Sequence, residues 1–224
     1  APTKQTFVLW EGVVQTTTSR VEHTTPKGHR TQQVILEMAR ELFLAQGFHG
    51  TTMRQVAAAA SVTLGAVYNH FSSKDELFKR VFAEYSPFRI IAPALASAQG
   101  ESTEELLRDA ALRMSRMLSE HNADLRLVFI ELVEFGGRNI PPVIDRNGQV
   151  VLDFHARLQQ APGALRPMSP LLMMRCFMGL MSSWFMTEAL FVGEQVPEAL
   201  AELKIEDAVD IFLHGALDNK EICE

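Results

Sequence analysis

The sequence has 224 residues, of which 47% are hydrophobic, so it is long enough for one large or two small domains with a substantial core. Its formal net charge of −6 at first disfavours a nucleic-acid-binding protein. The two cysteines, Cys176 and Cys223, fit neither a disulfide framework nor a metal site; such thiols are typical of a reducing cytoplasm, where we expect the protein to be found.

The charges are unevenly distributed along the chain. Residues 27–80 hold 7 Lys or Arg and 4 acidic residues, a balance of +3, whereas residues 81–224 hold 12 and 21, a balance of −9. In a protein with a basic segment and an acidic body, DNA would attract the segment and repel the body. Such a protein would approach DNA only with its basic segment first. The net charge therefore does not exclude DNA binding.

Residues 1–28 are rich in Thr and contain two prolines, which predicts a flexible N-terminal extension. Residues 7–14 could form a short strand; they are too short and lack the basic flank of a secretory signal. An alternative interpretation is an arm that contacts the DNA minor groove through Lys4, Arg20, Lys27 and Arg30.

A helix is predicted from Thr31 to Gln46, and Gly47 is placed to end it. Its apolar residues recur at helical spacing and form one wide stripe. We expect this helix to brace the two that follow.

Two short helices are predicted next. Thr52 and Gln55 have the spacing of a capping box at the start of the first. The segment Ser61-Val62-Thr63 interrupts that helix, because its hydroxyls compete for backbone hydrogen bonds, and Thr63 can then cap a second helix from Leu64 to about Phe71. Two helices joined by so tight a turn are typical of a DNA-binding helix-turn-helix.

A further helix is predicted from Ser73 to about Ile91. Ser73 and Glu76 have the spacing of a second capping box, and acidic residues occupy the first turn, where the helix dipole favours them.

The second helix of the pair carries few apolar residues. Only Val67 and Phe71 are spaced to face a core, so the remaining side chains can lie in a major groove. Asn69 has the paired donor and acceptor that suit adenine, and Gly65 allows DNA to approach closely. Leu64 or Ala66 could contact a thymine methyl group, and the expected phosphate contacts come from Tyr68, His70, Lys74 and the helix N-terminus at Thr52.

At these residues the sequence resembles the TetR family of bacterial transcriptional regulators, over roughly residues 30–80. The matching motifs are Gly47-Phe48, Thr51-Thr52, Ser61-Val62-Thr63 and Tyr68-x-His70-Phe71-x-x-Lys74-x-x-Leu77. The resemblance implies DNA contacts at Thr51, Thr52, Thr63, Leu64, Gly65, Ala66, Tyr68, Asn69, His70 and Lys74. Leu64 is a departure, because family members often have a polar residue at its position.

The rest of the chain is predicted to be helical, and no stretch alternates like a strand. The expected helices are Ser102 to Ser119, Asp124 to Phe135, Pro142 to Gln160, Ser169 to Val192 and Ile205 to Leu217. The long apolar run from Leu171 to Val192 contains Arg175 and Glu188, so we expect a buried helix and not a membrane span.

Six of the ten methionines lie in residues 168–186. Core packing is the simplest interpretation, since Met fills irregular cores. The alternative interpretation has two parts, an apolar effector pocket and a two-fold dimer interface. The predicted pocket residues are Met114, Met117, Phe129, Val133, Met178, Met181 and Phe185, and the predicted interface residues are Gly179, Ser183, Val209, Phe212 and Leu213.

We therefore predict an all-α protein with an N-terminal extension (residues 1–28), a helix-turn-helix DNA-binding domain (29–80) and a helical effector-binding and dimerisation domain (81–224). The expected function is a homodimeric repressor that binds a palindromic DNA operator and is released by a mostly apolar small molecule. The alternative is a helical small-molecule-binding or scaffold protein with a degenerate DNA-binding segment. The sequence contains no catalytic motif, and we expect no enzyme activity, cofactor or metal.

Overall fold

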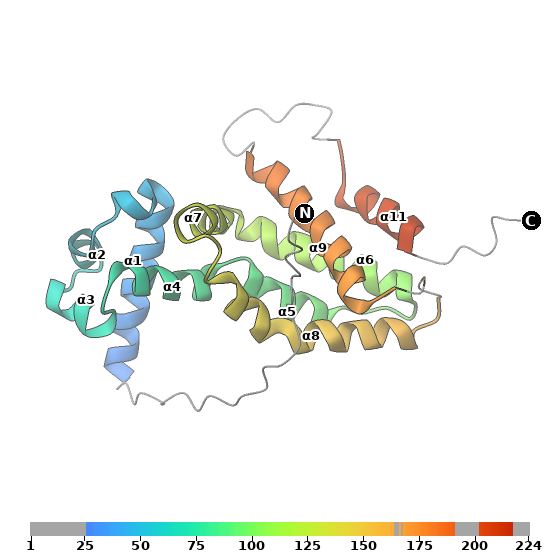
Figure 1. Cartoon of the computed structure of the whole chain (residues 1–224), viewed down its shortest axis with the longest axis horizontal. Coiled ribbons are helices and arrows are strands. Elements are labelled where there is room, and N and C mark those ends of the chain that lie inside the picture. The colour runs from blue at the N-terminus through green and yellow to red at the C-terminus, as the bar shows by residue number, and fades with distance from the viewer. Residues whose placement is uncertain (1–25, 164–165, 167, 191–201, 217–224) are drawn as a thin grey trace, which may run out of the picture.

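The computed structural model describes residues 26–163, 166, 168–190 and 202–216. In these ranges all regular elements are helices, which confirms the predicted all-α class. They form an elongated molecule (Figure 1). The helices are α1 Pro26–Gly50, α2 Met53–Ala59, α3 Leu64–His70, α4 Lys74–Tyr85, α5 Phe88–Ser97, α6 Thr103–Glu120, the 3₁₀ helix η1 Asn122–Asp124, α7 Leu125–Phe135, α8 Ile140–Gln160, α9 Pro170–Leu190 and α11 Ile205–Ala216.

The first helix is longer than predicted. It begins at Pro26, and its regular geometry ends at Gly47, whose φ of 74° only glycine adopts readily. Two of the four arm residues, Lys27 and Arg30, lie in α1, so they belong to a helix and not to a flexible extension. The other two arm residues, the strand predicted at 7–14 and Cys223 lie outside the described residues.

Four predicted N-cap residues begin their helices as expected. The side chain of each accepts a hydrogen bond from the backbone N–H three residues later, which satisfies one of the donors left open at a helix start. These residues are Thr52, Thr63, Ser73 and Ser102.

The second capping box forms only in part. Glu76 does not accept a hydrogen bond from the N–H of Ser73; its carboxylate accepts one from the N–H of Ser72 at 2.7 Å and another from the Ser72 hydroxyl. These two bonds lower the pKa of Glu76. The carboxylate therefore holds the connection between α3 and α4 in its ionised form.

The helix predicted from Ser73 to about Ile91 is two helices. Proline at position 87 restricts the residue before it to extended backbone, and Ser86 has a ψ of 147°. The chain turns there, and α5 starts at Phe88.

Two hydrophobic clusters lie on either side of this break. The head core contains buried residues from Ile35 to Phe82, and the body core contains buried residues from Ile90 to Leu213. We call α1–α4 the head and α5–α11 the body. Among the described helices none is both long and apolar enough to cross a membrane, and α9 buries Phe177, Met181 and Phe185 in the body core.

The head core also includes Val143 of α8 and, from a second body helix, two residues of α7. The α7 residues Leu127 and Phe135 are buried there, and the Phe135 ring lies 4.7 Å from the rings of both Phe48 and Phe78. In Figure 1, α7 lies beside α1 and α4, between the head and the other body helices. The head is therefore packed against the body through α7.

A buried ion pair joins the other end of α7 to the head. Arg40 of α1 donates from Nε to Oδ1 of Asp124 at 2.5 Å, and the Asp124 side chain is only 1% exposed. This hydrogen bond is the largest cause of the raised pKa of Arg40. The Arg40 guanidinium also lies over the ring of Tyr85. Both ends of α7 are thus held by head residues.

We expect Arg40→Met to lower the free energy of unfolding by about 3–5 kcal/mol, because it leaves the Asp124 carboxylate buried without its counter-charge. The matched control is Arg113→Met: the Arg113–Asp109 pair has the same 2.5 Å distance, but its side chains are 33% and 26% exposed, and such pairs contribute less than about 1 kcal/mol. Urea unfolding measures both, and equal losses would contradict the assigned role of burial.

Candidate nucleic-acid interface and apolar pocket

The start of α2 presents one of the two predicted threonines. Thr52 is exposed and forms the predicted capping box: its Oγ1 accepts from the N–H of Gln55 at 3.2 Å, and Gln55 Oε1 accepts from the N–H of Thr52 at 2.8 Å. Thr51 is fully buried, and its hydroxyl donates to the carbonyl of Gly47 at 2.8 Å. The predicted contact at Thr51 is therefore corrected to a structural role, and Thr52 is the accessible member of the pair.

The turn between α2 and α3 is a Schellman motif. The N–H of Ser61 donates to the carbonyl of Ala58 at 3.1 Å, and the N–H of Val62 donates to the carbonyl of Ala57 at 3.0 Å. Ser61 takes the left-handed position, with a φ of 54°. This turn fixes the angle at which α3 leaves α2.

Helix α3 buries Val67 and is followed by the buried Phe71, as predicted. The side chain of Thr63 caps it by accepting from the N–H of Ala66 at 3.2 Å. The other predicted residues lie on its outer surface: Thr63, Gly65, Tyr68 and Asn69 are exposed, and Leu64, Ala66 and His70 are half-buried. The structure thus brings seven predicted residues to one helix.

Lys74 is engaged within the protein. Its ammonium group donates to the carbonyls of Phe48 at 2.7 Å and Thr51 at 2.9 Å, and it lies 4.2 Å from the centre of the Phe48 ring. An ammonium group has three N–H donors, so one remains for a partner outside the protein. Lys74 ties the start of α4 to the segment between α1 and α2.

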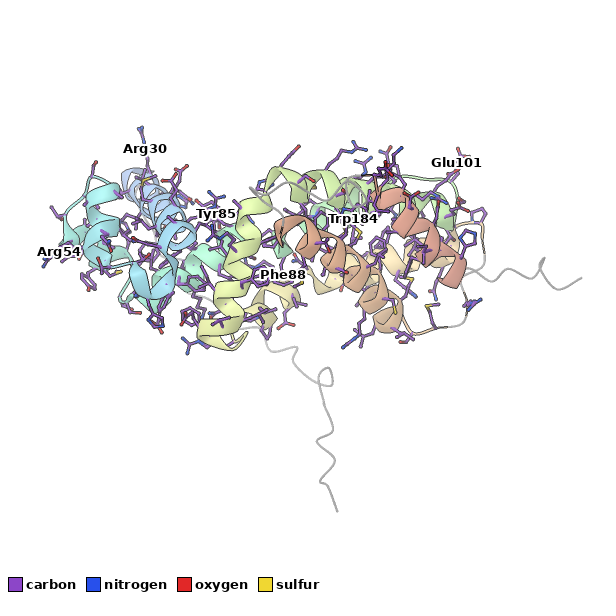
Figure 2. All side chains as sticks on the ribbon, turned by 90° about the horizontal axis from the view of Figure 1, so that it is seen from above. Arg30, Arg54, Tyr85, Phe88, Glu101 and Trp184 are labelled. Atoms are coloured by element: carbon purple, nitrogen blue, oxygen red, sulfur yellow. The ribbon has the colours of Figure 1, made fainter. Side chains whose placement is uncertain are left out.

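The sequence interpretation missed Arg54. This residue is exposed in the first turn of α2, and Figure 2 shows it at the outer end of the head, with Arg30 projecting from α1. A single arginine creates no spacing pattern in the sequence. Only its position beside the N-terminus of α2 identifies Arg54 as a candidate DNA contact. The accessible positive charge of the head is therefore larger than the predicted set implied.

The model of the bacterial regulatory proteins of the TetR family matches residues 35–81, which span α1 to α4. Residues 35–81 therefore carry the DNA-binding segment of the TetR family. AcrR, a helix-turn-helix transcriptional regulator of Shigella flexneri, is 41% identical over 59 residues, which is 26% of this chain and 27% of AcrR. The chain thus aligns with about a quarter of the length of the curated relatives it matches first.

Two solved structures show that the TetR-family fold extends through the body. A TetR-family transcription regulator from Marinobacter aquaeolei superposes with a TM-score of 0.63 at 19% identity, covering 86% of this chain and 98% of its own. NalD, the secondary repressor of the MexAB-OprM multidrug efflux pump in Pseudomonas aeruginosa, gives 0.59 at 22% identity, with 87% and 100% covered. The family is one of regulators and not of enzymes.

An apolar cavity of about 130 Å³ lies between α5, α6, α7 and α9. Five predicted pocket residues line it: Met114, Phe129, Met178, Met181 and Phe185. The other two are wrong by one helix position. Leu118 lines the cavity in place of Met117, and Leu132 in place of Val133, which is 80% exposed.

The predicted dimer residues divide between the surface and the interior. Gly179 and Ser183 are exposed on α9. Val209 and Leu213 are buried in the body core, and Phe212 is half-buried against Phe177, so the prediction of an intersubunit role for the two buried residues is corrected. The outward side of α11 instead presents Ile211, which is 75% exposed.

We expect Lys74→Met to lower the free energy of unfolding by about 1–3 kcal/mol, because two partly buried carbonyls lose a charged donor. Lys79→Met is the control, since Lys79 lies on the same helix with an exposed side chain. Thermal unfolding followed by circular dichroism compares the two. A Lys74→Met protein as stable as the control would contradict the structural role.

Proposed function

We propose that this protein is a DNA-binding transcriptional repressor of the cytoplasm, which binds a palindromic operator as a homodimer and is released by a mostly apolar small molecule. The single observation that carries the proposal is the outer surface of α3, whose residues the fold does not require.

Gly65 is the clearest example. Glycine in a helix costs about 1 kcal/mol relative to alanine. A Cβ atom placed on Gly65 would meet nothing closer than the Thr63 hydroxyl at 4.0 Å, so packing within the protein does not exclude a side chain. Close approach of a DNA backbone or base edge accounts for the glycine.

The neighbouring side chains suit the two kinds of DNA contact. Asn69 is exposed and can pair with adenine in the major groove, and Leu64 or Ala66 can contact a thymine methyl group. Tyr68, which is 50% exposed, and His70 are placed for phosphates. Arg54 and the N-terminus of α2 at Thr52 add a phosphate site, which fixes the position of α3 in the groove.

The DNA-binding prediction requires a target, which sequencing of the genomic fragments retained by the purified protein supplies. On a duplex with the enriched palindrome, we expect Asn69→Ala to weaken binding by about 1–3 kcal/mol. Arg54→Ala should reduce the slope of log affinity against log salt by about 0.9, since one phosphate contact is lost.

Arg146→Ala is the control, because it removes an exposed cation from the body. No enriched fragment, or equal effects of all three variants, would favour the alternative function, a helical ligand-binding or scaffold protein with a degenerate head.

Dimerisation follows from the size of the DNA site. One seven-residue α3 contacts too few base pairs to select a site in a genome. Two heads about 34–36 Å apart would face successive major grooves of a palindrome. We place the two-fold interface on the exposed sides of α9 and α11, where a Cβ built on Gly179 would meet no atom within 4 Å apart from its own helix backbone and chain neighbours.

We expect Gly179→Glu to convert the dimer to a monomer, because it places a charge at a close helix contact while leaving the protomer unstrained. Ser119→Glu is the control, an exposed small residue on α6. Sedimentation equilibrium measures the mass. A dimer unaffected by Gly179→Glu would remove α9 from the interface.

The release mechanism uses α7. One side of this helix lines the apolar cavity through Leu125, Val128, Phe129 and Leu132. An adjacent side enters the head core, and Asp124 at the start of α7 holds Arg40. A ligand that binds better when α7 is displaced would favour wrongly spaced heads, and by linkage would lower DNA affinity.

A further inference from the structure

A second apolar cavity adjoins the first. Its volume is about 410 Å³, against about 130 Å³ for the first, and it lies between α5, α8 and α9. We call the smaller cavity the first chamber and the larger one the second chamber. Four residues line both: Phe88, Ile91, Met178 and Ser182. Figure 2 labels Phe88 in the middle of the molecule, where α5 begins.

The four residues that line both chambers include one adaptable and one aromatic side chain, Met178 and Phe88. Met178 is half-buried and unbranched, so it can change rotamer and open a passage without disturbing the backbone. The backbone at Phe88 is fixed, because its carbonyl accepts from Nδ2 of Asn147 on α8 at 2.9 Å. The two chambers therefore meet at side chains of α5 and α9.

The lining of the two chambers offers no counter-charge to a charged ligand. No residue described as lining either chamber is charged; the polar ones are Ser182 in both and Asn147 and Ser169 in the second. Asn147 already donates to Phe88, and the Ser169 hydroxyl accepts from the N–H of Leu172 at 3.1 Å. A buried charge would have no counter-charge here.

We infer that the two chambers form one site for an elongated, uncharged, largely aliphatic molecule, which passes between Phe88 and Met178 and places its single polar group near Ser182. This inference rests on the proposed effector pocket and names its ligand class. Exposed apolar residues mark the open side of the second chamber, where a flexible chain can enter: Ile144, Leu152 and Leu171 are 47%, 45% and 72% exposed.

The test uses straight-chain 1-alkanols of increasing length, which displace the fluorescent probe N-phenyl-1-naphthylamine from the full-length protein. Affinity should tighten by about fourfold for each added CH₂, and should continue to do so up to a chain that fills both chambers. Dodecanoate and dodecylammonium should bind at least tenfold more weakly than dodecanol.

Two valine-to-phenylalanine substitutions each fill one of the two chambers. Val151→Phe fills the second chamber and Val128→Phe the first, since each valine is half-buried and lines only that chamber. We expect both variants to retain hexanol binding but to lose dodecanol affinity by at least tenfold. Circular dichroism and thermal unfolding verify that each variant is folded.

The outcomes separate the two proposals. If each substitution removes half of the bound alkanol without changing the length dependence, the chambers are independent and the inference fails, while the effector pocket stands. If neither substitution changes binding of the probe or of any alkanol, the effector pocket itself fails. If long alkanols bind only to the Gly179→Glu monomer, a second copy of the chain covers the second chamber, and the inference is overturned.

Discussion

The structure depends on the two-sided packing of α7. Most helices of a small protein bury one stripe in one core, but this helix contributes Leu127 and Phe135 to the head core and lines the body cavity with Val128, Phe129 and Leu132. The buried Asp124–Arg40 pair makes the arrangement specific. A carboxylate 1% exposed has to stay with its guanidinium, because separation would leave a charge without solvent or partner.

This arrangement gives the proposed switch a physical route. The first chamber and the head core lie against adjacent sides of α7, and Val128 contacts both, so a shift of α7 changes the packing in both. The close rings of Phe48, Phe78 and Phe135 leave little free volume to absorb such a shift. The head must then move as a unit.

Local signals in the sequence were sufficient to predict most of the head. Capping requires only a hydroxyl and a backbone N–H three residues apart, so Thr52, Thr63 and Ser73 could be identified without a fold. The break at Ser86 was also predictable, since a proline follows it, but the uninterrupted apolar pattern concealed it. Buried Thr51 and tethered Lys74 could not be predicted, because both depend on contacts with the end of α1.

The body was less predictable because its helices are apolar on more than one side. Met117 and Leu118, or Leu132 and Val133, are equally hydrophobic, and a rotation of one residue exchanges which of the two lines the cavity. Val209 and Leu213 pose the same difficulty, since an apolar residue on the last helix can face its own core or a partner subunit. Only the packing of α11 on α6 and α9 decides between them.

Because α7 belongs to the head core, the head cannot be exchanged between related proteins as one continuous segment. A chimera that exchanges residues 26–85 between two family members would join a foreign α1 and α4 to the native Leu127, Phe135 and Val143, and would cut through a packed interior. The transferable unit is discontinuous in sequence: it comprises the first four helices together with the side of α7 and the start of α8 that they cover. Natural divergence of these segments is therefore expected to be correlated, even though about forty residues separate them along the chain.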